Sequence, residues 1–387
     1  MDNLKRWSTI GLFCAAVWAS SATAQVPTPP EVDAHAYLLV DVSAHQVLAQ
    51  HLSDEQVEPA SLTKLMSAYL VFDALKSQKI RLDQTFPVSV RAWKMPGSRM
   101  FIDPKMQVPV EDLIKGMIVQ SGNDATVALA EGVGGNVERF VELMNEQARR
   151  LGMTATVYKN PEGLPAPGHL TTAHDLSILA QHLIQDFPQY VGYYAMKKYR
   201  YPGTPAANDT NRNTLLFRDP TVDGLKTGHT DAAGYCMIAT AKRDAPNLAG
   251  HRLLVVVLGA SSESTRSAEA QKILNWGFSV FEPIKLFNAG QAVTQLRLWK
   301  GQDNEVGVGR HEPIVVSVPL GQAKQISTQI EFKDPLVAPI QLDAPVAQMH
   351  LKLGGADLTV LPLLALKGVD QASIFGRAWD AVRLWIK

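Results

Sequence analysis

The order of apolar and polar positions divides the chain into a mixed region followed by a β-rich region. Two apolar runs, at 37–42 and 46–50, predict a β-hairpin that opens the mixed region. A strand-like run at 234–242 and a strongly β-branched run at 252–258 predict an antiparallel pair of strands near its end. A helical pattern at 268–281 follows them. With several helical segments in between, this order predicts an α/β (α+β) domain, in which one sheet carries helices on its faces.

The helical segments of the mixed region differ in how much of their surface is apolar. A helix predicted from Ser61 to about Lys76 carries apolar residues around most of its circumference, which indicates a central, buried helix. Two further helices, at 110–119 and 125–132, are separated by Gln-Ser-Gly-Asn-Asp. Glycine and asparagine permit a tight left-handed bend, so we expect Ser121 and Asn123 to project from this junction. Thr172 is predicted to cap another helix.

From about residue 283 the helical periodicity stops and the chain reads as a small all-β sandwich domain. Short apolar runs there are separated by Gly, Pro, Asp and Asn, as is typical of strands joined by turns. The predicted strands are 294–299, 314–318, 325–332, 348–353 and 358–362.

The last residues, 372–387, return to a helical pattern with aromatic and aliphatic residues on one side. The segment is too short to span a bilayer, but its two tryptophans and its basic opposite face fit a helix that lies on a membrane surface. A helix docked on the β-domain is the alternative. The apolar side comprises Ile374, Phe375, Ala378, Trp379, Val382, Trp385 and Ile386, and the polar side Arg377, Asp380, Arg383 and Lys387.

The first 24 residues have the form of a secretory signal peptide: Lys5 and Arg6, a short apolar run, and Ala-Thr-Ala before the expected cleavage. We therefore predict an exported protein with domains at 25–283 and 284–370 and an amphipathic helix at 371–387. Without the signal peptide, the 37 basic and 37 acidic residues become 35 and 36, a balance that argues against nucleic acid as a partner. Of the two cysteines only Cys236 remains, and we expect it in a strand core.

Three short motifs carry the candidate chemistry: Ser61-Leu-Thr-Lys64, Ser121-Gly-Asn123 and Lys226-Thr227-Gly228. Residues i and i+3 share a helix face, so Ser61 and Lys64 are expected to form a nucleophile beside its base. The alternative for Ser61 is an ordinary helix N-cap. Each motif alone is weak evidence, but their order, with separations of 60 and 105 residues between the first residues, makes the set specific. No metal-binding motif is recognised, and we expect no cofactor.

With these motifs in this order, the chain resembles the low-molecular-mass penicillin-binding proteins that are serine D-alanyl-D-alanine carboxypeptidases. The blocks 120–125, 222–230 and 274–278 resemble the same family. The resemblance implies a serine β-lactamase/transpeptidase-like catalytic domain and removal of the terminal D-Ala from peptidoglycan pentapeptide stems. It also implies covalent inhibition by β-lactams and a location on the periplasmic face of the inner membrane.

The chemistry assigns a role to each motif. Ser61 attacks the peptide carbonyl, and Lys64 accepts its proton if burial and Lys226 lower the lysine pKa. Ser121 passes a proton to the leaving amine, and Asn123 holds either the substrate amide or the Lys64 ammonium. The Ser61 N–H is one expected oxyanion donor.

Further roles follow only from the resemblance. It implies that the second oxyanion donor is the His229 N–H and that Lys226 and Thr227 hold the terminal carboxylate, with Gly228 leaving room for the substrate. Arg212 and Arg266 match arginines that the family keeps near the cleft.

Three other functions compete with this interpretation. A β-lactamase would need a general base such as a glutamate, and Glu162 lies in a suitable turn, but no Asn follows at the E-x-x-x-N spacing. A DD-endopeptidase would use the same residues, although such members usually lack the β-domain. A catalytically silent peptidoglycan-binding protein is disfavoured because all the required side chains are present.

Overall fold

The computed structural model describes residues 27–386, so the predicted signal peptide at 1–24 lies outside the described residues. The first domain is built on a five-stranded antiparallel sheet whose strands lie in the order β2-β1-β7-β6-β5. Strand β5 therefore forms one edge. The strands are β1 (Ala36–Asp41), β2 (Gln46–His51), β5 (Val222–Thr230), β6 (Gly234–Ala245) and β7 (Leu248–Ala260), with a small pair β3 (Thr85–Pro87) and β4 (Gln107–Pro109) elsewhere.

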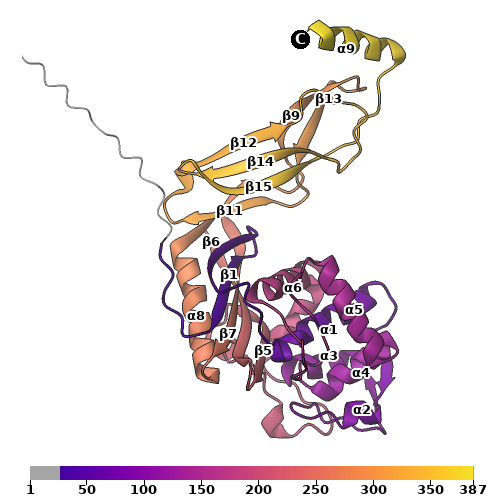
Figure 1. Ribbon diagram of the computed structural model, residues 1–387, viewed down its shortest axis with the longest axis vertical. Coiled ribbons are helices and arrows are strands. Elements are labelled where there is room, and N and C mark those ends of the chain that lie inside the picture. The colour runs from indigo at the N-terminus through magenta and orange to yellow at the C-terminus, as the bar shows by residue number, and fades with distance from the viewer. Residues whose placement is uncertain (1–26, 387) are drawn as a thin grey trace, which may run out of the picture.

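Both faces of this sheet are covered, as Figure 1 shows, with most helices beside one face and α8 along the other. Alternate residues of β7 point to opposite faces of the sheet. Leu254 and Val256 belong to the core beneath the helices, while Leu253 and Val255 pack against α8. Burial on both faces explains why β7 reads as a continuous apolar run. The helices are η1 (Ala60–Thr63), α1 (Lys64–Lys76), α2 (Val90–Trp93), α3 (Val110–Val119), α4 (Asn123–Gly134), α5 (Val137–Arg150), α6 (Ala173–Asp186), η2 (Pro188–Ala195), η3 (Ala206–Asn208), α7 (Leu215–Arg218) and α8 (Glu263–Val280).

Two details of the helical region differ from the sequence prediction. Ser61 lies in the 3-10 helix η1, which precedes α1, and its side chain caps neither helix. The cap residues are Pro59 and Thr63, and neither makes a side-chain capping hydrogen bond. At the α3–α4 junction the left-handed residue is Ser121, with φ +59°, whereas Gly122 has φ −62°. The cap predicted at Thr172 is confirmed, because its Oγ1 accepts from the Asp175 N–H at 3.0 Å.

The second domain is all-β, as predicted, and the expected fold class is confirmed. Its main sheet has six strands in the order β12-β14-β15-β10-β9-β13, and β11 pairs separately with β8. Strands β8, β10 and the short β13 were not predicted from the sequence. The strands are β8 (Phe281–Phe287), β9 (Ala292–Trp299), β10 (Glu305–Gly309), β11 (Ile314–Pro319), β12 (Ile326–Phe332), β13 (Leu336–Val337), β14 (Pro345–Leu353) and β15 (Ala356–Ala365), with a 3-10 turn η4 (Ala323–Gln325).

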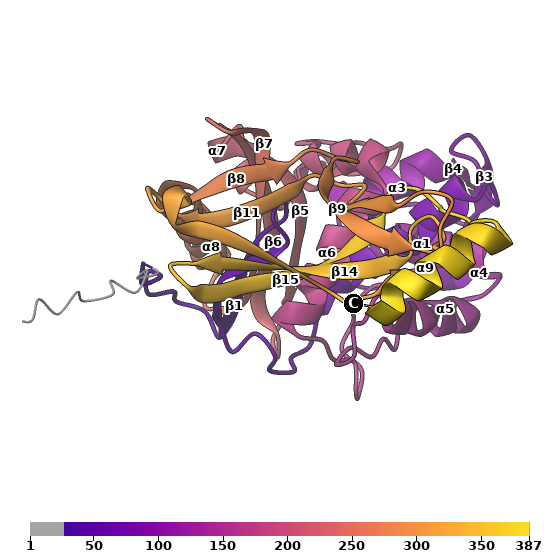
Figure 2. The same cartoon turned by 90° about the horizontal axis from the view of Figure 1, so that it is seen from above.

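The last helix, α9 (Ile374–Ile386), lies beyond the upper end of the β-domain in Figure 1, and the view from above in Figure 2 places it over the helical side of the first domain. None of its described side chains is buried, and Phe375 and Trp385 are 87% and 89% exposed. A polar contact joins α9 to the β-domain: the Lys300 N–H donates to the Asp380 carboxylate at 2.6 Å. Within residues 27–386, no helix is long and apolar enough to cross a membrane.

A buried polar cluster joins the two domains. His251 on β7 contacts the Asp41 carboxylate at 2.6 Å, and the Ser317 hydroxyl from β11 donates to the same carboxylate. The Gln46 side chain accepts from the Ser317 N–H at 2.6 Å. Because a carboxylate buried in this way needs its partners, the β-domain is tied to the edge of the first sheet.

Candidate active site

A cavity of about 310 Å³ opens where the β5 edge faces η1 and the α3–α4 junction. All three sequence motifs reach it, although they are far apart in the chain. Its lining residues are Ser61, Ser98, Ser121, Arg212, Thr227, Gly228, His229, Tyr235, Glu263 and Arg266.

Ser61 and Lys64 meet as their spacing predicted. The Lys64 ammonium lies 3.0 Å from the Ser61 hydroxyl, within reach for proton transfer. The preceding residue, Ala60, is held in a left-handed conformation with φ +47°, which is unfavourable for a residue with a Cβ. Ala60 is the first residue of η1, and a strained backbone conformation of this kind is typical of functional sites.

Lys64 is held by two further acceptors. Its ammonium donates to the Asn123 side-chain oxygen at 2.7 Å and to the Glu162 main-chain carbonyl at 2.6 Å. The side chain is 2% exposed, and burial lowers its pKa to about 7, with Glu162 and Asp124 opposing and Arg212 reinforcing the decrease. A substantial fraction of Lys64 is therefore neutral near pH 7, as a general base requires.

Lys226 and Ser121 form the second contact across the cavity. The Lys226 ammonium donates to the Ser121 hydroxyl and to the Thr227 carbonyl, both at 2.9 Å. Burial lowers the pKa of Lys226 well below its usual value, and the neighbouring charge of Lys64 lowers it further. We expected Lys226 to lower the pKa of Lys64, but the cation that lowers it is Arg212.

Asn123 has both ends of its amide engaged. Its oxygen accepts from Lys64, and its NH₂ group donates to the Pro96 carbonyl at 2.7 Å. Its main-chain N–H donates to the Ser98 carbonyl at 2.7 Å, which brings Ser98 to the cavity. Of the two roles considered for Asn123, this geometry favours holding the lysine.

The β5 edge lies close against the main chain at Ser61. A Cβ added at Gly228 would stand 3.2 Å from the Ser61 nitrogen and 3.1 Å from the Ala60 Cβ, tighter than ordinary contacts. Glycine therefore permits the close approach of β5 to η1, which a larger residue would force apart by a few tenths of an ångström. His229 follows at the exposed end of the strand, and its ring stacks on Tyr235 with centroids 4.0 Å apart.

The two predicted arginines both line the cavity, but their surroundings differ. Arg266 is 4% exposed and donates to the Gly228 carbonyl at 3.3 Å and to Glu263 at 3.0 Å. Its guanidinium also lies over the Tyr235 ring, 5.7 Å from the centroid. Arg212 is exposed, in the loop before α7. Both place positive charge where a carboxylate could bind.

Sequence reasoning missed several contributors to the site. Ser98 lies in the loop 94–100, where Pro96 and Gly97 are typical of a turn but give no sign of chemistry. Tyr235 could have been found from its register, because it pairs with His229 across β5 and β6. The carbonyls of Pro96 and Glu162 have no side-chain signature, so no residue pattern could reveal them.

Cys236 lies outside this chemistry. Its side chain is fully buried in β6, its thiol contacts the Ala233 carbonyl at 3.3 Å, and burial raises its pKa to about 11. The prediction of a strand-core cysteine is confirmed. Among residues 27–386 no group of His, Cys, Asp and Glu side chains could hold a metal ion.

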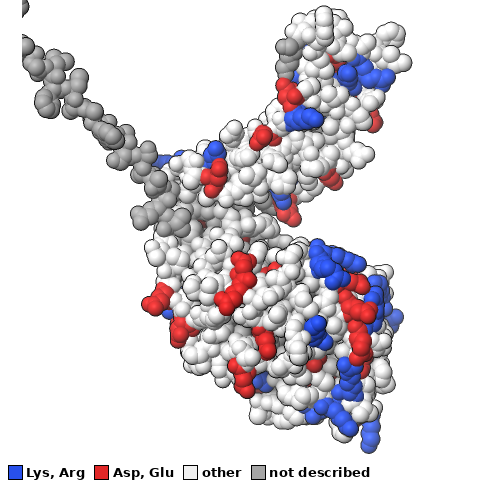
Figure 3. Space-filling model, viewed as in Figure 1, with Lys and Arg blue, Asp and Glu red and all other residues white. Residues whose placement is uncertain are grey.

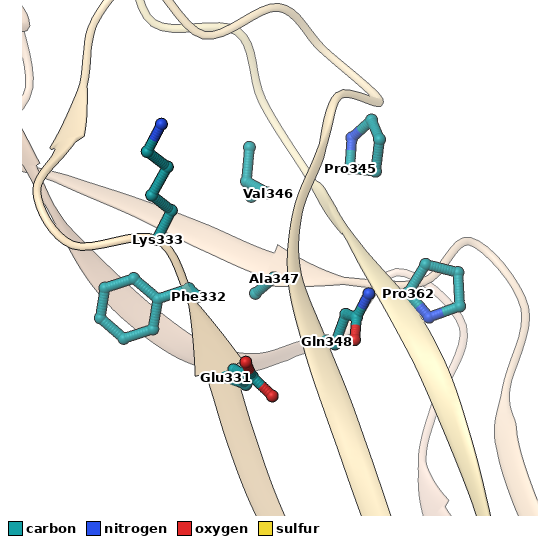
Figure 4. A pocket seen from close by; sticks show the side chains of 8 residues that line it. All are labelled: Glu331, Phe332, Lys333, Pro345, Val346, Ala347, Gln348 and Pro362. Carbon is teal, nitrogen blue, oxygen red and sulfur yellow. The ribbon is translucent and has the colours of Figure 1, made fainter.

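A second cavity, of about 370 Å³, lies in the β-domain and is shown in Figure 4. Its side chains come from the end of β12 and from β14 and β15, and they include neither a serine nor a cysteine. This cavity therefore lacks the serine and lysine pair found in the first one. The lining residues are Glu331, Phe332, Lys333, Pro345, Val346, Ala347, Gln348 and Pro362.

Comparison with known proteins agrees with this geometry. The D-alanyl-D-alanine carboxypeptidase (peptidase S11) family matches residues 23–262, and the C-terminal domain of penicillin-binding protein 5 matches residues 281–371. The D-alanyl-D-alanine carboxypeptidase DacC of Escherichia coli K12 is 38% identical over 381 residues, 96% of this chain and 92% of its own.

Solved structures lead to the same family. Penicillin-binding protein 5 from Haemophilus influenzae is similar with a TM-score of 0.82 and 35% identity, over 89% of this chain and 100% of that one. Penicillin-binding protein D2 from Listeria monocytogenes, in its ampicillin-bound form, is similar with a TM-score of 0.58 and 29% identity, over 65% of this chain and 100% of that one. The chain therefore belongs to the serine-type D-alanyl-D-alanine carboxypeptidase family, and within it to the penicillin-binding protein 5 type.

Proposed function

We propose that this carboxypeptidase removes the terminal D-Ala from peptidoglycan pentapeptide stems through an acyl-enzyme on Ser61. The observation that carries the proposal is the buried cluster in which Lys64 contacts both Ser61, at 3.0 Å, and Asn123, at 2.7 Å. A partly neutral lysine held beside a hydroxyl is the arrangement that activates a serine nucleophile.

The reaction proceeds in two halves. Ser61 Oγ attacks the carbonyl of the penultimate D-Ala while its proton passes to Lys64, and the carbon–nitrogen bond then breaks. Ser121 relays a proton to the departing amine, so that D-Ala leaves as a neutral amine and Ser61 holds an ester. Water then attacks the ester with Lys64 as base, releasing the shortened stem and restoring the hydroxyl.

Binding is assigned to the β5 edge. The substrate lies along the edge strand, and the main-chain N–H groups of Ser61 and His229 stabilise the oxyanion. Lys226, Thr227, Arg212 and Arg266 surround the terminal carboxylate. The positive charge on this side of the cavity favours an anionic chain end, which is why the reaction is limited to carboxyl-terminal residues.

β-Lactams are proposed as covalent inhibitors that acylate Ser61, as the ampicillin-bound relative suggests. Incubation of the intact protein with penicillin should add one penicillin mass, and Ser61→Ala should abolish the adduct. The matched control is Ser279→Ala, because Ser279 on α8 is bonded only locally, to the Trp276 carbonyl. An adduct that survives in Ser61→Ala would exclude Ser61 as the nucleophile.

The balance between carboxypeptidase and endopeptidase activity is tested on defined muropeptides. We expect release of free D-Ala from pentapeptide stems and little cleavage of cross-linked dimers. Cleavage of dimers at an equal rate would favour the endopeptidase.

The cellular setting is also a proposal. We place the protein on the periplasmic face of the inner membrane, exported by its first 24 residues and held at the surface by α9. The domains follow the predicted division at 25–283, 284–370 and 371–387. The exposed aromatic side of α9 supports the last of these divisions, while the end of α8 at Val280 and the pairing of β8 (Phe281–Phe287) with β11 favour a start of the β-domain at Phe281.

A further inference from the structure

Glu162 is a buried carboxyl that the mechanism above does not use. It lies in the loop 160–164, which packs against the start of the Ser61 region, and only 6% of the residue is exposed. The loop is fixed from both ends: the Asn160 side chain accepts from the Gly163 and Leu164 N–H groups at 2.7 and 3.1 Å. The Ser67 hydroxyl from α1 donates to the Pro161 carbonyl at 2.6 Å.

The same loop holds the catalytic lysine directly. The Glu162 carbonyl is an acceptor for the Lys64 ammonium at 2.6 Å, the shortest of the three contacts of that ammonium. The buried side chain of the same residue acts on this charge, because Glu162 is the first of the charged groups that affect the pKa of Lys64 and it raises that pKa. Burial raises the pKa of the Glu162 carboxyl, and Lys64 is the strongest opposing charge.

We propose that Glu162 is a positioning residue for Lys64: its carbonyl holds the ammonium, and its carboxylate stabilises the protonated form of the lysine. The inference rests on the roles proposed for Ser61 and Lys64. It assigns to Glu162 a function distinct from that of a β-lactamase glutamate, because it acts on the lysine and not on the hydrolytic water.

The other charges around Lys64 come from three elements. Asp124 on α4 is negative, but its carboxylate already accepts main-chain N–H groups of residues 100–102. Arg212, in the loop before α7, and Lys226, on β5, are the nearby cations.

Two further titratable groups lie around this region, one acting on Glu162 and one in contact with η1. Arg91 on α2 acts on Glu162 and lowers its pKa. His169 contacts Thr63 at 3.0 Å and is neutral at pH 7, because burial lowers its pKa to about 4. Of the two anions that raise the pKa of Lys64, Glu162 has the larger effect, and the carboxylate of the other, Asp124, is engaged by a row of main-chain donors.

The direction of the pKa change at Lys64 follows from the negative charge of the Glu162 carboxylate. A carboxylate beside Lys64 stabilises the ammonium and raises the pH at which the lysine loses its proton. Replacing Glu162 with Gln removes that charge while keeping the main-chain carbonyl. The neutral, active lysine then forms at lower pH.

The experiment measures the rate constant for acylation by penicillin on the full chain between about pH 5 and pH 9, followed by intact mass. In E162Q we expect the acid limb, which is the part of the pH profile where the acylation rate constant rises, to lie about one pH unit lower than in the unchanged protein. The rate constant on the alkaline plateau should change less than about twofold. E162D retains the charge and should keep the limb near that of the unchanged protein. E142Q, at an exposed glutamate on α5, is the control for a general change in charge.

Each outcome decides the proposal. An acid limb in E162Q that coincides with that of the unchanged protein, or a shift matched by E142Q, would overturn it. A loss of acylation at all pH values in both E162Q and E162D would show a purely structural role and would also overturn it. These results are separate from failure of the proposed function, which Ser61→Ala tests.

Discussion

Gly163 is the position where the loop carrying Glu162 touches the main chain before Ser61. It has φ +86°, and a Cβ there would lie 1.9 Å from the Ala60 carbonyl oxygen. Backbone atoms cannot move aside as a flexible side chain can. A single missing methyl group therefore allows the loop to approach both Ala60 and Lys64.

We expect Gly163→Ala to lower the thermal midpoint strongly, with a cost of about 3 kcal/mol from the left-handed conformation and the clash together. The acylation rate should fall as well, because Ala60 and Lys64 are displaced. Gly152→Ala is the matched control: it has φ +81° but nothing within 4 Å, so it should cost only about 1 kcal/mol. Calorimetry and acylation rates measure both. Equal destabilisation by the two variants would show that the clash is relieved.

At the scale of elements, the start of α4 organises a loop as well as a helix. The Asp124 carboxylate accepts from the Met100 and Phe101 N–H groups at 2.8 Å and from Ile102 at 3.3 Å. This clamp fixes the loop that carries Ser98 and Pro96 to the junction holding Ser121 and Asn123. One helix terminus thus positions two walls of the cavity.

Asp124→Asn should destabilise the first domain by about 2 kcal/mol, because one acceptor oxygen is replaced by a donor facing buried N–H groups. Penicillin acylation should slow because Asn123 and Ser98 lose their fixed separation. Asp103→Asn is the control in the same loop, where the carboxylate accepts only from the exposed Lys105 N–H. Calorimetry and acylation kinetics distinguish the two. A wild-type acylation rate in Asp124→Asn would show that the clamp does not position the site.

At the scale of the whole molecule, the cavity and the exposed helix lie in different parts of the chain. Figure 1 shows α9 beyond the β-domain, away from the helices that surround Ser61. The cluster of Asp41, His251 and Ser317 ties the β-domain to the first sheet on the side opposite α9. In Figure 3, basic and acidic side chains alternate over the helical part of the visible face, so that face presents no field of one sign.

Truncation after Gln371 should release the protein from lipid vesicles while leaving D-Ala release from a soluble peptide unchanged. The apolar side of α9 supplies the binding area, and none of its described residues supports the first domain. A double variant, Trp379→Glu with Trp385→Glu, should release the full-length chain as well. Val337→Glu, at an exposed apolar residue of the β-domain, is the control. Vesicle sedimentation measures the fraction of the protein that is bound to lipid. If the truncated chain still sediments with the vesicles, α9 is not the membrane anchor.

Much of the architecture was predictable because it depends on local periodicity. The hairpin at β1 and β2, the helix α3 and the continuous apolar run of β7 follow from alternation or from burial on two faces. Strands β8 and β10 were missed because Pro283 and the glycines 307 and 309 resemble turn residues. Their strand conformation comes from pairing with β11, β9 and β15, which is a tertiary effect.

The sequence alone determined which reactive side chains to expect in the cavity, because the spacing of Ser61 and Lys64 and the order of the three motifs are properties of the chain itself; it did not reveal Ser98 or Tyr235. Only the tertiary structure decided how those side chains are charged and held. Burial lowers the pKa of Lys64 to about 7, and its acceptors include the Glu162 carbonyl, 98 residues away in the chain. Likewise Ser121 meets Lys226 across 105 residues. Desolvation and main-chain hydrogen bonds depend on what packs around an atom, and that environment is formed by segments distant in sequence.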